Sequence, residues 1–156
     1  MLKKNNIILK INKSDRNGLD SFFFAVFRNS IDITKLLINF AEENNIRIQI
    51  NKRDSMGNYP FLNAIKCHNN IDMVKLIINY AKEKRINFDI NEENWYGDYP
   101  LLTAVKNKAI DKVKFLMEFA KENNIILKIN KKSRNEQFPL LYATNYKTID
   151  MVNLCQ

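Results

Sequence analysis

Apolar residues recur at spacings of three and four in three similar stretches of the chain, near residues 31–41, 71–81 and 110–120. In the last stretch they are Ile110, Val113, Leu116, Met117 and Ala120. This spacing puts them on one face of a helix, so the pattern predicts three amphipathic α-helices. Each stretch opens on an Ile-Asp pair, and an acidic residue in the first turn suits the helix dipole. A further pair at 149–150 predicts a fourth copy.

A shorter helix is predicted before each of these. Its marker is an alanine that recurs at intervals of 39, 40 and 39 residues, at Ala25, Ala64, Ala104 and Ala143. Pro60, Pro100 and Pro139 stand four residues before the last three alanines. Proline is tolerated at the first helical position because the amide there has no partner within the helix. The sequence therefore predicts helices that begin at the three prolines.

The segments after the longer helices have a different pattern. Asn44-Asn45 and Asn123-Asn124 are predicted helix ends, because asparagine tolerates the left-handed conformation that often terminates a helix. The alternation of Ile46, Ile48 and Ile50 then predicts an extended segment with one buried face.

Two motifs resemble a known repeat. Residues 57–64 (GNYPFLNA) and 97–104 (GDYPLLTA) are similar to the ankyrin signature T-P-L-H-x-A with its preceding glycine turn, and 71–78 (IDMVKLII) resembles the second helix of that repeat. The period is about 39 residues instead of the usual 33. The signature histidine is replaced in every copy, by Phe23, Leu62, Leu102 and Leu141. The resemblance implies an all-α fold, an ankyrin-like helix-turn-helix solenoid with β-turn and extended connectors.

We expect a single array over residues 1–156. Its predicted parts are the tail of a partial repeat at 1–11, repeat 1 at 12–50, repeat 2 at 51–90, repeat 3 at 91–129 and a truncated repeat 4 at 130–156. Residues 4–13 nearly duplicate residues 122–131, so the sequence opens in the tail of a repeat and stops within a second helix. Terminal repeats normally carry polar outer faces. We therefore expect further repeats at both ends or end-to-end self-association.

The resemblance also implies a function, namely noncatalytic binding of a protein partner as a scaffold. Ankyrin-like arrays bind partners through their turn tips and the exposed flank of the first helix. Carried over to this sequence, the partner-binding candidates are Arg16, Asn17, Ser55, Met56, Trp95, Tyr96, Asp98, Arg134 and Asn135 at the turns, with Phe24, Phe27, Lys66 and Lys106 on the first helices. Trp95-Tyr96 is the first choice because aromatic residues often anchor interfaces. The other interpretation, slightly favoured for Trp95 itself, is that its side chain packs onto the adjacent turn.

Phe24 and Phe27 stand where the next two copies have Asn63/Lys66 and Thr103/Lys106. Two phenylalanines three residues apart share a helix face. They are either an apolar anchor for a ligand or a surface that packs against a preceding partial repeat, and the second interpretation is favoured because the sequence opens within a repeat.

Composition adds a second functional candidate. The chain is 46% hydrophobic and 27% charged, as in a folded globular protein, and its net charge is +8. The basic residues are spread along the chain, which favours a solvated surface over a nucleic-acid footprint. The alternative of a module that binds nucleic acid or an acidic membrane depends on basic residues near the turns: Lys52, Arg53, Lys131, Lys132 and Arg134. A purely structural spacer within a longer array also stays open.

The sequence offers little for catalysis, so we expect no enzyme, metal or cofactor. His68 is the only histidine, and adjacent residues such as Cys67 and His68 rarely meet as a catalytic pair. One histidine and two distant cysteines, Cys67 and Cys155, do not make a zinc site. No apolar run approaches the length of a membrane span, and no signal peptide is recognisable. An intracellular, cytoplasmic protein with reduced thiols is the expectation.

Overall fold

A computed structural model describes residues 11–67 and 71–145 of the chain. These residues form seven α-helices and no β-strand. The four short helices are α1 (Ser21–Phe27), α3 (Pro60–Lys66), α5 (Pro100–Lys106) and α7 (Pro139–Asn145). The three long helices are α2 (Ile31–Glu43), α4 (Asp72–Glu83) and α6 (Ile110–Glu122). The predicted all-helical class is therefore confirmed, as are the helix starts at Pro60, Pro100 and Pro139.

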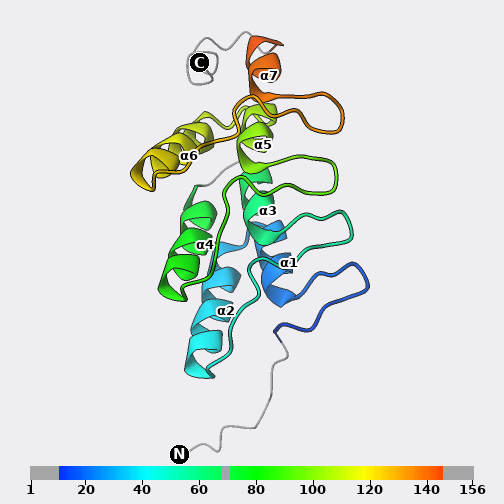
Figure 1. The fold of residues 1–156 in the computed structure, drawn as a ribbon. Helices are drawn as coiled ribbons and strands as arrows, with labels where there is room; N and C mark the ends of the chain where they lie inside the picture. The colour runs from blue at the N-terminus through cyan, green and yellow to red at the C-terminus, as the bar shows by residue number, and fades with distance from the viewer. Residues whose placement is uncertain (1–10, 68–70, 146–156) are drawn as a thin grey trace, which may run out of the picture.

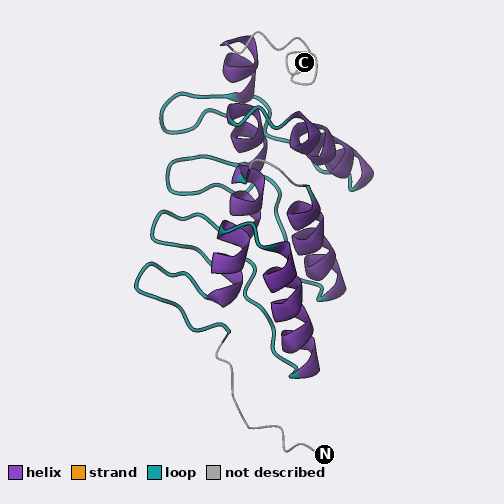
Figure 2. Cartoon of the chain, turned by 180° about the vertical axis from the view of Figure 1, so that it is seen from behind, coloured by secondary structure: helices purple, strands orange, loops and turns teal. Residues whose placement is uncertain are grey.

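The helices form two adjacent columns (Figure 1). The short helices stack in chain order, because α1 packs on α3, α3 on α5 and α5 on α7. Each of α1, α3 and α5 also packs on the long helix that follows it. Loops project from the column of short helices on the side away from the long helices, and Figure 2 shows the same arrangement from behind.

The helix ends follow local rules with one difference between copies. Asn45 and Asn124 have φ of 55° and 54°, which confirms the predicted left-handed ends of α2 and α6. Arg85 takes the same conformation after α4, with φ of 49°, although nothing in the sequence pattern predicts an arginine there. At α1, which has no proline, the Asp20 carboxylate caps the helix by accepting from the amide of Phe23 at 2.8 Å.

The core lies between the two columns and continues beneath the connecting segments. The predicted apolar face of α6 is largely buried, since Val113, Leu116 and Ala120 are in the core. Ile48 and Ile50 are buried while Arg47 and Gln49 are exposed, so the predicted one-sided burial of this connector is confirmed. These residues belong to one continuous cluster that links all the helices described. Neighbouring units are therefore held mainly by shared burial of apolar surface.

Two series of side-chain hydrogen bonds join successive turns and connectors. Tyr59 and Tyr99 donate their hydroxyls to the carbonyls of Glu92 (2.7 Å) and Lys131 (2.9 Å). A series of asparagine amides does the same between connectors: Asn12 to the carbonyl of Arg47 (2.9 Å), Asn51 to that of Asn87 (2.8 Å) and Asn91 to that of Ile126 (2.9 Å). Because the bonds recur with the period of the sequence, they fix the register of adjacent units.

Candidate functional surface

Four turns precede the short helices, and each is organised by its own first residue. Asp54 accepts at Oδ1 from the amides of Met56 (2.9 Å) and Asn58 (2.8 Å). Asn94 accepts in the same way from the amides of Tyr96 and Asp98, both at 2.9 Å. Asp15 and Ser133 hold the first and last turns by equivalent bonds. A short polar side chain at this position therefore fixes the loop conformation before any partner is present.

Backbone hydrogen bonds link the turns to one another. The amide that follows the first residue of one turn donates to a carbonyl of the preceding turn: Ser55 to Asn17 (3.0 Å), Trp95 to Met56 (3.2 Å) and Arg134 to Tyr96 (3.1 Å). The turns thus form one continuous edge, which we call the turn edge, and the residues at its tips have fixed spacing.

Trp95 lies against the turn that precedes it. A Cβ added to Gly57 would sit 2.4 Å from the indole ring, so the ring covers this glycine directly. The guanidinium carbon of Arg53 lies 5.0 Å from the Trp95 ring centre and 5.4 Å from that of Tyr59. Packing of Trp95 onto the adjacent turn is therefore observed. The side chain remains 50% exposed, so it also presents a free aromatic face.

All the predicted tip residues reach the surface. Tyr96 is 52% exposed and Met56 is also exposed, so three apolar or aromatic side chains reach the surface on two adjacent turns. Asp98, by contrast, lies behind the tip at the base of the third turn, where its carboxylate pairs with Lys106 at 2.9 Å. The remaining predicted residues are exposed at the first, second and fourth turns: Arg16, Asn17, Ser55, Arg134 and Asn135.

The first helices carry the second group of predicted residues, beside the turn edge. Phe24 and Phe27 are both exposed, their ring centres are 6.4 Å apart, and the Arg28 guanidinium lies 5.1 Å from the Phe24 ring centre. Lys66 and Lys106 occupy the matching positions of α3 and α5. The Lys66 ammonium donates to Oδ1 of Asn58 at 2.6 Å. Along the column of short helices, the two phenylalanines of α1 are thus followed by one lysine on α3 and one on α5.

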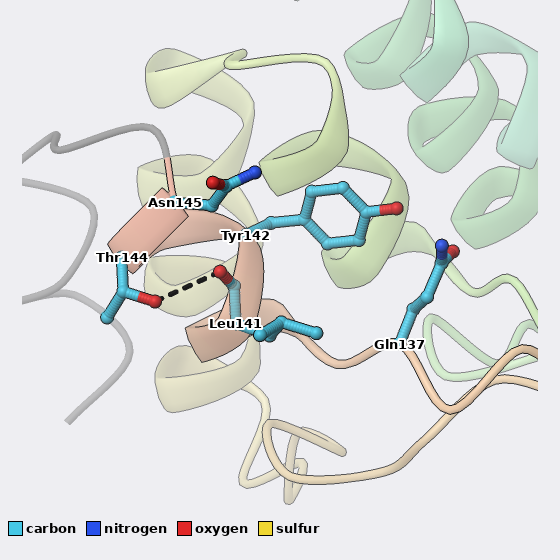
Figure 3. A pocket seen from close by; sticks show the side chains of 5 residues that line it. All are labelled: Gln137, Leu141, Tyr142, Thr144 and Asn145. Atoms are coloured by element: carbon cyan, nitrogen blue, oxygen red, sulfur yellow. Dashed lines mark hydrogen bonds between the residues drawn. The ribbon is translucent and has the colours of Figure 1, made fainter.

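This face is hollowed in two places. A cavity of about 270 Å³ is lined by Lys66, Asp98, Thr103, Lys106 and Asn107. A second of about 550 Å³, drawn in Figure 3, is lined by Gln137, Leu141, Tyr142, Thr144 and Asn145. Tyr142 also faces Lys106, whose ammonium is 5.7 Å from the ring centre. The two cavities therefore adjoin through this cation–aromatic contact.

Two reactive side chains have structural roles at the ends of the short helices. The Cys67 thiol, which is free, lies within 3.8 Å of the carbonyls of Val26 and Phe27 at the end of α1, and burial raises its pKa. The buried Lys112 ammonium donates to the carbonyls of Ala64 (2.7 Å), Ile65 (3.2 Å) and Cys67 at the end of α3. Carbonyls at helix ends lack intrahelical donors, and Lys112 supplies donors to those of Ala64 and Ile65.

The burial of Lys112 does not follow from the sequence pattern. Lys112 stands two residues after the isoleucine of its Ile-Asp pair, where the preceding copy has Met73, so the pattern predicted only a solvated charge. A lysine at an apolar register position was the available signal. His68, Cys155 and the duplicated segment at 4–10 lie outside the described residues.

Within residues 11–67 and 71–145, no group of acidic, histidine or cysteine side chains could hold a metal ion. None of the helices described is long and apolar enough to cross a bilayer. Comparison of the chain with protein-family models gave no matching family, and comparison with curated proteins gave no match.

Proposed function

We propose that this chain is a noncatalytic protein-binding scaffold with the architecture of an ankyrin-type array, and that it binds a partner through the turn edge and the adjacent face of the first helices. The observation that carries the proposal is the exposure of Met56, Trp95 and Tyr96 on two turns that are bonded to each other. Aromatic side chains on a rigid frame lose little entropy on binding, which is why they recur as interface anchors.

The ion pairs near the turns favour this function over binding to phosphates. Of the five basic residues that supported a nucleic-acid surface, four pair with carboxylates: Lys52 with Asp20, Arg53 with Glu92, Lys131 with Glu93 and Lys132 with Glu136. Charges that are already neutralised release few counterions from nucleic acid. These carboxylates therefore neutralise much of the positive charge at the turn edge.

A peptide library displayed on phage tests the scaffold. We expect selected peptides to bind with affinities that fall far less steeply with salt than binding to phosphates does, and to shift the amide NMR signals of the turns and first helices. Tyr96→Ala should weaken the affinity of the selected peptides about tenfold, as expected for an aromatic anchor. Ile126→Ala is the matched control, because Ile126 is 89% exposed on a connector remote from the turn edge.

Two results would count against the function. One is that selected peptides shift only signals from α2, α4 and α6. The other is a short DNA duplex that binds more tightly than any peptide and loses affinity steeply with salt, which would favour the phosphate-binding alternative.

A further inference from the structure

The smaller cavity, which we call the Lys66–Lys106 pocket, has an uneven balance of charge. Among the described residues that line it, there are two ammonium groups, from α3 and α5, and a single carboxylate, that of Asp98. Asp98 contacts Lys106 at 2.9 Å and therefore neutralises one of the two. Asp54 also acts on Lys66 electrostatically, but its Oδ2 accepts from the amide of Asn58 at 2.9 Å.

Lys66 is the cation left short of an anion. Among the described residues its ammonium contacts only the neutral amide oxygen of Asn58, which also accepts from Asn94 at 3.0 Å. Burial lowers the pKa of Lys66 and the charge of Lys106 lowers it further, while Asp98 and Asp54 act in the opposite direction. A half-buried ammonium in this position would gain from a negative group that enters the cavity from solvent.

A second observation concerns the same cavity. Thr103 lines it and is only 4% exposed, and its hydroxyl has no hydrogen-bond partner within the part of the chain that the structure describes. A buried hydroxyl left unpaired is unfavourable, so such groups usually have a partner or a ligand. Asn107 adds an amide at the rim, where it donates to the carbonyl of Lys66 at 3.2 Å. Donors from two adjacent units thus surround one hollow.

We propose that the Lys66–Lys106 pocket binds the carboxylate of a glutamate or aspartate side chain from an acidic segment of a partner protein. This inference rests on the proposed scaffold function and specifies the chemistry of the partner. A carboxylate is a monoanion, which matches the single uncompensated positive charge of the pocket. Tyr142 beyond Lys106, and Phe24 and Phe27 beyond Lys66, offer apolar contact to residues that flank the acid.

The probe is a short N-acetylated peptide of alternating glutamate and leucine. The matched control is the same peptide with glutamine in place of each glutamate. We expect the glutamate peptide to bind at least about tenfold more tightly, because charge-assisted hydrogen bonds are the stronger ones. Binding of the glutamate peptide should shift the amide NMR signals of Thr103, Lys106 and Asn107 most.

Variants then assign the effect to the pocket. Lys66→Gln should weaken the glutamate peptide about tenfold and leave the glutamine peptide unchanged. Lys75→Gln is the matched control, since it removes the same charge from an exposed position on α4. Asp98→Asn should tighten binding of the glutamate peptide, because it removes the competing carboxylate.

Thr103→Val separates a binding role from a structural one. The change is nearly isosteric and removes the unpaired hydroxyl, so the melting temperature should rise while the glutamate peptide binds more weakly. A higher melting temperature with unchanged affinity would show that the hydroxyl has no ligand role and would contradict the assigned pocket.

The remaining outcomes are distinct. Equal binding of the glutamate and glutamine peptides on the first-helix face overturns the carboxylate pocket but leaves the scaffold function intact. A glutamate peptide that binds and is insensitive to Lys66→Gln also overturns it. If a short DNA duplex binds more tightly than the glutamate peptide and depends on Lys66, the pocket accepts phosphate instead and the proposal is wrong.

Discussion

The same sequence position is buried in the middle repeats of the stack and exposed in the first repeat. Met73 of α4 and Lys112 of α6 are buried, and Lys112 contacts the end of α3 in the preceding repeat, whereas Ile33, at the same position of α2, is exposed. The most apolar of the three is thus the most exposed, and a lysine is buried. Burial at this position is therefore decided by whether another described unit packs against it, not by the hydrophobicity of the residue.

The last short helix, α7, likewise exposes a position that is buried in the middle of the stack. Leu102 of α5 is fully buried, while Leu141 at the matching position of α7 is 46% exposed. The largest expected effect tests this difference. Leu102→Ala should lower the free energy of unfolding by about 3 kcal/mol, through lost burial and the cavity that remains. Leu141→Ala should cost less than about 1 kcal/mol, since only part of the side chain is buried. Urea unfolding followed by circular dichroism measures both, and equal losses would refute the distinction.

The turns allow a second test. Gly57 has φ of 75° and its Cα is covered by the Trp95 ring. Gly57→Ala should therefore cost about 2 kcal/mol, from backbone strain and from displacement of the indole. Trp95 is the only tryptophan, so its fluorescence should shift to longer wavelength as the ring becomes more exposed. Unchanged emission together with unchanged stability would contradict the observed packing.

The fourth turn provides the opposite change. Glu136 occupies the position of Gly57 and has φ of 58°, a conformation that is unfavourable for a residue with a side chain. Glu136→Gly should therefore raise the free energy of unfolding by about 1 kcal/mol. Its exposed pair with Lys132 contributes little that would be lost. Thermal unfolding checks the sign, and a lower melting temperature would show that the glutamate contributes more than its conformation costs.

The smallest expected effect concerns the start of α1, where Asp20 replaces the tyrosine of the middle units. Burial raises the pKa of this carboxyl, although the amides of Phe23 and Phe22 and the charge of Lys52 lower it. A raised pKa in the folded state means that Asp20 favours folding below its ordinary value of 3.8, and that this contribution is lost as pH rises through the folded-state pKa.

Asp20→Asn keeps a good helix cap without a buried charge. The variant should therefore gain stability relative to the parent chain as pH rises from 3.8 through the raised pKa of Asp20. The loss of the 3.7 Å contact with Lys52 offsets part of this gain. Urea unfolding at acidic and neutral pH measures the difference, and a difference that does not vary with pH would exclude Asp20 as its source.

The candidate surface was predictable in its parts but not in its arrangement. The exposed tips Trp95 and Tyr96 follow from the position of the turn glycine, which the sequence marks clearly. The partner of each side chain does not follow, because Arg53 reaches Trp95 and Asn58 meets Asn94 only when neighbouring units are stacked. The Lys66–Lys106 pocket lies between two units whose lining residues are 40 positions apart in the chain.

The sequence by itself determined the local structure: helix starts at the prolines, helix ends at the asparagines and the buried face of each long helix. These depend on backbone conformation and on periodicity, which act over a few residues. Only the tertiary structure decided that Lys112 is buried, that Ile33 is exposed and that the Thr103 hydroxyl finds no partner among the described residues. Those outcomes depend on contacts between units, and a contact requires a neighbour whose position no local pattern encodes.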